Sequence, residues 1–166
     1  MFQVGDYVVY KRDVCKIKEI RKNHLRDQDY YILCPIDDPS LIIDVPVENR
    51  LGFLRSPISK GDALKLIEKI PTIEVIDCNN RTIENEYRAL LQSNQLEDLI
   101  KIIKTTYLRN EERTKNGKKI GEKDNMYFKN AEKYLYNELS ISLDLSFDDT
   151  RQYIIDQVQN VQNNNV

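Results

Sequence analysis

The first third of the chain carries short apolar runs of the kind that form β-strands. These runs are residues 8–10, 15–17, 30–36 and 41–47. In the second run, Cys15 and Ile17 flank a lysine, and this alternation is typical of a strand with one buried face. Polar turns separate the runs. About four or five strands within residues 1–57 predict a small, strongly bent sheet of the SH3-like barrel type.

After Pro57 the apolar residues recur three and four positions apart, which is the period of an amphipathic helix. Successive stripes of this kind contain Leu66, Leu90, Leu99, Leu135 and Ile154. Ser59 and Ser146 stand where N-caps of the first and last helices are expected. Strands followed by helices indicate two separate modules rather than alternating βαβ units. The sequence therefore predicts an α+β fold, with a β module over residues 1–57 and an all-α module of about five helices over residues 58–166.

Scarce residue types exclude several kinds of chemistry. The chain has one histidine, His24, and its three cysteines, Cys15, Cys34 and Cys78, are at neither metal-ligand nor disulfide-scaffold spacing. Its five glycines form no phosphate-binding loop. No apolar run is long enough to span a membrane, and the first residues do not resemble a signal peptide. We therefore expect a cytoplasmic protein that is not an enzyme, has no metal or other cofactor and does not associate with membranes.

Positive charge is concentrated in one stretch of an otherwise balanced chain. The formal net charge is −2, whereas residues 99–133 hold ten basic and five acidic side chains, and residues 134–166 hold one basic and five acidic. One interpretation is a phosphate-binding face on the third and fourth helices and the loop between them. The other is a solvated helix surface whose charges pair along the helix. The DNA contacts of the first interpretation would be Lys101, Lys104, Arg109, Arg113, Lys118, Lys119 and Lys123.

Over about residues 1–158 the chain resembles the CarD/CdnL family of bacterial transcription regulators. The resemblance lies in an ordered series of short segments that crosses both modules. In the β module these segments are VGDYVVY (4–10), VPVEN (45–49) and GFLR (52–55). In the helical module they are YRALL (87–91), RNEER (109–113), GEK (121–123), AEKYL (131–135) and NEL (137–139). The order of these segments is more specific than any one of them.

The resemblance implies a function for each module. The β module would be a Tudor-like domain, similar to one in transcription-repair coupling factor, that docks on the RNA polymerase β subunit by adding a strand to a sheet edge. The helical module would contact promoter DNA at the upstream edge of the transcription bubble and stabilise the open complex. By position in the sequence, the polymerase contacts would fall on Lys22, Asn23, Arg26 and Asp44, where Asp44 replaces a residue that is often basic in the family.

The chain departs from the family at the residue that inserts into DNA. Many members carry a tryptophan early in the second helix of the helical module, whose ring wedges into the minor groove. This chain has no tryptophan, and Ile83 occupies that position. Ile83 is either a partly exposed apolar wedge, which is the orientation we expect, or a member of the buried stripe of its helix. Arg88 remains as a basic neighbour, whereas Glu84 and Glu86 are acidic.

The sequence therefore favours a non-enzymatic, monomeric transcription regulator whose partners are the RNA polymerase β subunit and promoter DNA. The acidic net charge predicts weak binding to free DNA, so that docking on polymerase would have to raise the local concentration of the DNA-contacting face. The alternative is an adaptor that binds polymerase or another protein without contacting DNA. The missing tryptophan, together with Glu84 and Glu86, favours that alternative.

Overall fold

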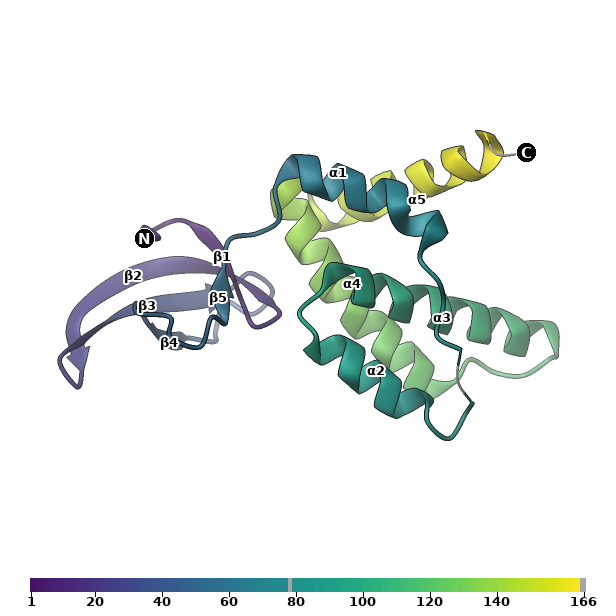
Figure 1. Cartoon of the computed structure of the whole chain (residues 1–166), viewed down its shortest axis with the longest axis horizontal. Coiled ribbons are helices and arrows are strands. Elements are labelled where there is room, and N and C mark those ends of the chain that lie inside the picture. Colours follow the sequence, from purple (N-terminus) through teal and green to yellow (C-terminus); the bar gives the residue numbers. More distant parts are fainter. Residues whose placement is uncertain (78, 165–166) are drawn as a thin grey trace.

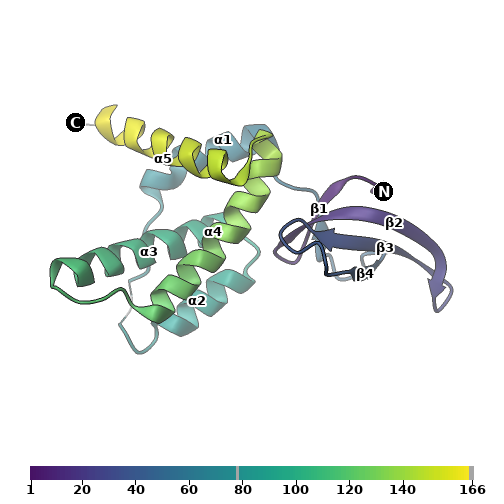
Figure 2. The ribbon, with the colours of Figure 1, turned by 180° about the vertical axis from the view of Figure 1, so that it is seen from behind.

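The computed structural model describes residues 1–77 and 79–164, and in these residues a five-stranded antiparallel sheet is followed by five α-helices (Figure 1). The fold is α+β, as the sequence predicts. Strands lie at one end of the molecule and helices at the other, and a short extended segment joins them (Figures 1 and 2). Cys78 lies outside the described residues.

The sheet is open, so the predicted closed barrel is not confirmed. Its strands are β1 (Tyr7–Tyr10), β2 (Asp13–Leu25), β3 (Gln28–Pro35), β4 (Ile43–Pro46) and β5 (Leu54–Arg55). Their order is β4-β3-β2-β1-β5, which leaves β4 and β5 as the two edges. Strand β5 contributes only two residues, and both pair with β1. A strand this short cannot also close the sheet against β4.

Strand β2 is longer than the sequence pattern predicts and continues into a tight hairpin with β3. The expected polar turn begins at Lys22, but pairing resumes at Leu25 and Gln28. The two residues between them, Arg26 and Asp27, have φ values of 51° and 57°. Two positive φ angles in a two-residue loop are the geometry of a type I′ turn, which matches the twist of the flanking strands. Register shifts within the β2–β3 pairing bend the ribbon.

The helices are α1 (Lys60–Lys69), α2 (Ile83–Gln92), α3 (Leu96–Lys115), α4 (Glu122–Leu143) and α5 (Phe147–Asn164), with a 3₁₀ turn η1 (Ile70–Thr72) after α1. Both predicted caps are confirmed. The Ser59 hydroxyl accepts a hydrogen bond from the Asp62 amide at 3.1 Å, and the Ser146 hydroxyl accepts one from the Asp149 amide at 3.0 Å. Helix α4 packs against each of the other four helices and forms the axis of the module (Figure 1).

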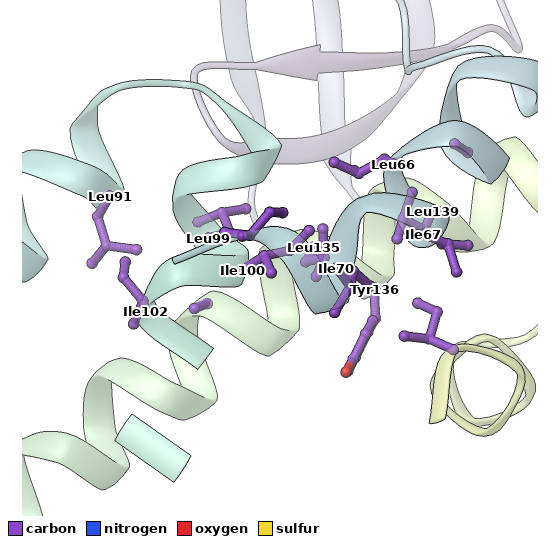
Figure 3. Close-up of a cluster of buried hydrophobic side chains, with 14 of the residues drawn as sticks. Leu66, Ile67, Ile70, Leu91, Leu99, Ile100, Ile102, Leu135, Tyr136 and Leu139 are labelled. Atoms are coloured by element: carbon purple, nitrogen blue, oxygen red, sulfur yellow. The ribbon is translucent and has the colours of Figure 1, made fainter. Parts of the chain in front are cut away.

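Buried apolar side chains form two separate clusters, one in each module. The sheet cluster includes Val8, Ile17, Tyr31 and Leu33. In the helical cluster, aliphatic side chains from α1, α3 and α4 converge, as Figure 3 shows for Leu66, Ile67, Leu99, Ile100, Leu135 and Leu139. The buried residues of the sheet cluster end at Leu54, and those of the helical cluster begin at Ala63.

Candidate functional site

The predicted polymerase contacts lie together at one end of the sheet. Lys22 pairs with Asp29 across the β2–β3 hairpin at 3.0 Å, and the Asn23 amide donates a hydrogen bond to the same carboxylate at 3.1 Å. The Lys22 ammonium is the main cause that lowers the pKa of Asp29 below its usual value. His24 Nε2 lies 3.1 Å from Asp44 Oδ2 and so connects β2 with β4 across β3. The structure thus places Lys22, Asn23 and Asp44 close together at the distal half of the ribbon.

The β4 edge carries an exposed apolar pair that the sequence analysis did not single out as a site. Leu41 and Ile42 directly precede β4, and the Ile42 side chain is 64% exposed. Strand β4 pairs with β3 only, so its outer edge presents unpaired backbone groups, with Pro46 as the one residue that lacks an N–H. The signal was present in the sequence as three consecutive apolar residues, Leu41, Ile42 and Ile43, directly before Asp44. An edge of this kind can accept an additional strand.

Ile83 is buried, so the expectation of a partly exposed wedge is wrong. Its side chain is 7% exposed and belongs to the helical cluster together with Tyr87 and Leu91. Ile73 and Ile76, from the segment before α2, belong to the same cluster. A side chain packed in this way offers no surface for insertion between base pairs.

Lys104 is not part of a free basic face either. Its ammonium donates hydrogen bonds to the backbone carbonyls of Ile70 and Ile73, at the end of α1 and η1. The Ile70 carbonyl also accepts a backbone hydrogen bond from the Ile73 amide at 3.3 Å, and Lys104 adds a donor at this helix end. Burial lowers the pKa of Lys104 below its usual value. Lys101, three residues earlier, is 3.9 Å from Asp98 and is more exposed, so the two lysines do not act as one face.

Arg109 is a structural residue in this fold. Its Nε donates to Asp124 Oδ2 at 3.1 Å and its Nη1 donates to Asn80 Oδ1 at 2.8 Å. Asp124 is buried and also accepts a hydrogen bond from the Tyr87 hydroxyl at 2.9 Å. The group ties α2, α3 and α4 together. Arg109 therefore contributes less to a DNA-contacting face than its place in the basic stretch predicts.

Arg88 and Lys123 are exposed and share one acidic partner. Glu84 lies 3.0 Å from the Arg88 guanidinium and 2.9 Å from the Lys123 ammonium. The hydrogen bond from Lys123 is the main cause that lowers the pKa of Glu84. Surface pairs of this type are weak, so a phosphate can compete for either cation. Both residues remain accessible, Lys123 in the first turn of α4, next to the α3–α4 loop, and Arg88 in the middle of α2.

The α3–α4 loop retains the basic residues that are open to a ligand. Lys118 and Lys119 are exposed, and no ion pair involves them among the described residues. Arg113 and Lys118 help to line a polar hollow of about 220 Å³, together with Asn80 and Asn116. Gly117 turns the chain there with a φ of 71°, a region that favours glycine. We refer to Arg113, Lys118 and Lys119 as the basic loop cluster.

A buried ion pair fixes the β module against the helical module. Arg55, in β5, donates from Nη1 and Nη2 to the two carboxylate oxygens of Glu138, in α4, at 2.9 and 2.7 Å. The Ile58 amide donates to Glu138 Oε2 at 2.9 Å. The Glu138 side chain is only 2% exposed. In the sequence, Glu138 stands three residues after Leu135 and so falls within the apolar stripe of α4. A charged residue in that stripe indicates a buried ion pair, and the sequence analysis did not use this signal.

Two further contacts support the same junction. Asp37 Oδ2 lies 3.2 Å from both the Lys133 ammonium and the Asn137 amide nitrogen of α4. Burial alone would lower the pKa of Lys133, but the hydrogen bond and charge of Asp37 raise it. Arg12 donates to the Leu91 carbonyl at 3.0 Å and lies 5.4 Å from the centre of the Tyr134 ring. The β1–β2 turn, the β3–β4 loop and β5 therefore all contact the helices.

Within the described residues, histidine, cysteine and carboxylate side chains form no group of three or more that could hold a metal ion. None of the helices in that part of the chain combines the length and the apolarity that crossing a membrane requires. Comparison of the chain with models of known protein families and with curated proteins gives no match.

Proposed function

We propose that this protein is a transcription regulator that docks on the RNA polymerase β subunit through its β module and contacts promoter DNA through its helical module. The ordered segments shared with the CarD/CdnL family support this proposal, because they run through both modules. In this proposal the β module serves as a Tudor-like domain with an open sheet. The helical module stabilises the open complex at the upstream edge of the bubble.

The polymerase contact is assigned to the β4 edge and the adjacent hairpin. Leu41 and Ile42 supply apolar surface beside the unpaired backbone of β4. Lys22, Arg26 and Asp44 supply charges on the same part of the sheet. In strand addition, main-chain hydrogen bonds give affinity and side chains give specificity. The hairpin charges would set which polymerase surface is accepted.

The DNA contact is assigned to the basic loop cluster, with Arg88 and Lys123 beside it. No residue of this chain replaces the family tryptophan as a wedge in this proposal, because Ile83 is buried. DNA is then held by phosphate contacts alone, which position a protein but read no sequence. An affinity of this kind is small on its own and depends on tethering.

The observation that carries the proposal is the junction formed by Arg55 and Glu138. A buried bidentate pair between modules holds the β4 edge and the basic loop cluster in a fixed relation. Two surfaces held at a fixed distance and angle are what a protein needs to bridge polymerase and the DNA that emerges from it.

Footprinting of promoter complexes tests the DNA contact. The double variant Lys118→Glu and Lys119→Glu should lose the added protection upstream of the bubble and reduce the salt slope of open-complex stabilisation by about 2, since each phosphate contact contributes about one unit. The control is Lys60→Glu with Lys65→Glu, an equal change of charge at exposed positions of α1. Equal footprints for both double variants would contradict the assignment.

Capture of the full-length chain by polymerase tests the β-module contact. Ile42→Asp should abolish capture, because it places a charge on the apolar border of the β4 edge. Leu145→Asp is the matched control, since Leu145 is an exposed apolar residue of the helical module at 38% exposure. If Leu145→Asp removes capture and Ile42→Asp does not, the two modules have been assigned the wrong way round.

A protein-only adaptor is the second candidate. It is favoured by the internal use of Lys104 and Arg109, which leaves a smaller basic surface than the sequence predicts. In that case polymerase would still capture the wild-type protein, but adding the protein would not change the footprint upstream of the bubble. The same two experiments therefore separate the candidates.

A further inference from the structure

An apolar hollow of about 430 Å³ lies between α3, α4, α5 and η1, away from every residue assigned above to polymerase. Its lining is mainly aliphatic and aromatic and includes Ile100, Ile103, Phe128, Tyr136, Ile154 and Ile155. A volume of this size falls in the range of sites that bind small molecules. The hollow also differs from the larger one of about 550 Å³ at the module junction, whose lining is rich in charged residues.

Three charged side chains meet at this hollow, and two of them are cations. Lys104 uses its ammonium for the carbonyls of Ile70 and Ile73, which leaves one of its three protons for a further acceptor. Arg151 lies with Nε 3.3 Å from Glu132 Oε1. Glu132 therefore has a cationic partner, whereas Lys104 forms no ion pair within the part of the chain that the structure describes.

The same groups are desolvated. Burial raises the pKa of Glu132, with the charge of Arg151 opposing it, and burial raises the pKa of Tyr136 to about 12. Burial also lowers the pKa of Lys104. The tyrosine hydroxyl points away from the aliphatic cluster, as Figure 3 shows. Shifted titratable groups that line a cleft are a general mark of binding sites.

We propose that this hollow binds an amphipathic monocarboxylate, with its apolar body between α3, α4 and α5 and its carboxylate at Lys104. The apolar lining selects the body, and the one unbalanced cation selects a single negative charge. Arg151 provides a second donor close by through its terminal nitrogens. A polypeptide segment would need partners for its backbone, and the lining consists instead of apolar side chains with charges from only three residues. The proposal is independent of the function assigned to the two modules.

Isothermal titration of the full-length protein with decanoate, below its micelle concentration, tests this site. Decanoate should bind saturably with one site per chain, and decanol should bind about tenfold more weakly, because a charge-assisted hydrogen bond is lost. No saturable binding of decanoate, or equal binding of decanol, would overturn the proposal.

Two variants locate the site. Ile155→Trp should fill the rim of the hollow and weaken decanoate binding at least about tenfold. Leu108→Trp is the matched control, an exposed aliphatic residue of α3 outside the lining, and should leave binding unchanged. Equal effects of the two tryptophans would place decanoate elsewhere on the surface and refute the assignment.

The role of Lys104 is tested by Lys104→Gln, because glutamine can still donate hydrogen bonds to the carbonyls of Ile70 and Ile73. This variant should bind decanoate and decanol equally, while its affinity for decanol stays at the wild-type value. A retained preference for decanoate would show that Lys104 does not bind the carboxylate. Arg151→Gln provides the second measurement if Lys104→Gln melts below the titration temperature.

Discussion

The strongest prediction concerns the ion pair between Arg55 and Glu138. Arg55→Ala removes two charge-assisted hydrogen bonds and leaves a carboxylate that is 2% exposed with the Ile58 amide as its remaining partner. Removing one member of a buried pair costs about 3–5 kcal/mol. Because the Arg55 side chain is 31% exposed, water can solvate part of the site, and we expect a loss of about 2–3 kcal/mol.

Thermal and urea unfolding followed by circular dichroism measure this loss. For a chain of 166 residues, each kcal/mol lowers the melting temperature by about 2–4 °C, so Arg55→Ala should melt about 4–12 °C below the wild type. The urea transition should also broaden or separate into two steps, because the modules have separate cores and lose the contact that couples them.

A double-mutant cycle with Glu138→Gln isolates the pair itself. We expect a coupling energy above about 1.5 kcal/mol, in the range for hydrogen bonds to charged groups. Arg50 and Glu48 provide the control, since their side chains meet at 2.6 Å but are 78% and 54% exposed. Their cycle should give less than about 0.5 kcal/mol. A coupling energy for Arg55 and Glu138 as small as that of the control would refute the conclusion that this pair holds the junction.

Three other predictions follow from buried or desolvated groups. Ile83→Ala should lower stability by about 2–5 kcal/mol, and Ile83→Trp should also destabilise by overpacking, as melting temperatures would show. Lys104→Met should cost about 1–3 kcal/mol in urea unfolding, because it leaves the Ile70 and Ile73 carbonyls without their donor. Burial raises the pKa of Glu132. The native state therefore keeps the carboxyl proton at pH values where the unfolded chain has already lost it. The contribution of Glu132 to stability falls as the pH rises through this range. The melting temperature of Glu132→Gln relative to wild type should therefore increase as the pH rises above the ordinary pKa of a glutamic acid, and a constant difference would contradict this assignment.

Sequence patterns correctly predicted the helix caps and strands whose formation is decided by residues a few positions apart in the chain. Ser59 and Ser146 cap their helices because the bond they accept comes from an amide three residues later. The apolar runs of β1, β3 and β4 likewise became strands. The change from strand to helix periodicity near Pro57 was visible for the same reason, and β5 and α1 lie on either side of it.

The orientation of Ile83 was not predictable, because its stripe is compatible with either a buried or a partly exposed side chain. What decides it is the segment before α2, which folds back and places Ile73 and Ile76 against the same cluster. Closure of the sheet was undetermined for a related reason. It depends on whether β5 is long enough to pair on both sides, and strand length is the weakest part of a pattern-based assignment.

The basic stretch shows why charge counts overestimate a binding face. Lys104 and Arg109 bind groups that lie 15 to 34 positions away in the sequence, so no local pairing rule identifies their partners. Lys118 and Lys119 follow a helix end and have no such partner among the described residues, which is why they remain available. The candidate DNA surface is therefore smaller than the predicted helix face and is centred on the α3–α4 loop.

If the proposed function is correct, the basic loop cluster is large enough to hold promoter DNA only when the junction between the two modules is rigid. Tethering through polymerase raises the local concentration of the basic loop cluster at DNA, but the gain is lost when the geometry forbids both contacts at once. Arg55, Glu138 and Asp37 make contacts between the modules, and Arg55 and Glu138 belong to neither of the two assigned binding surfaces. Arg55→Ala should therefore weaken the upstream footprint while leaving polymerase capture intact, as the double variant of Lys118 and Lys119 should, although Arg55 belongs to neither assigned binding surface. Loss of capture together with the footprint would instead place Arg55 in the polymerase contact.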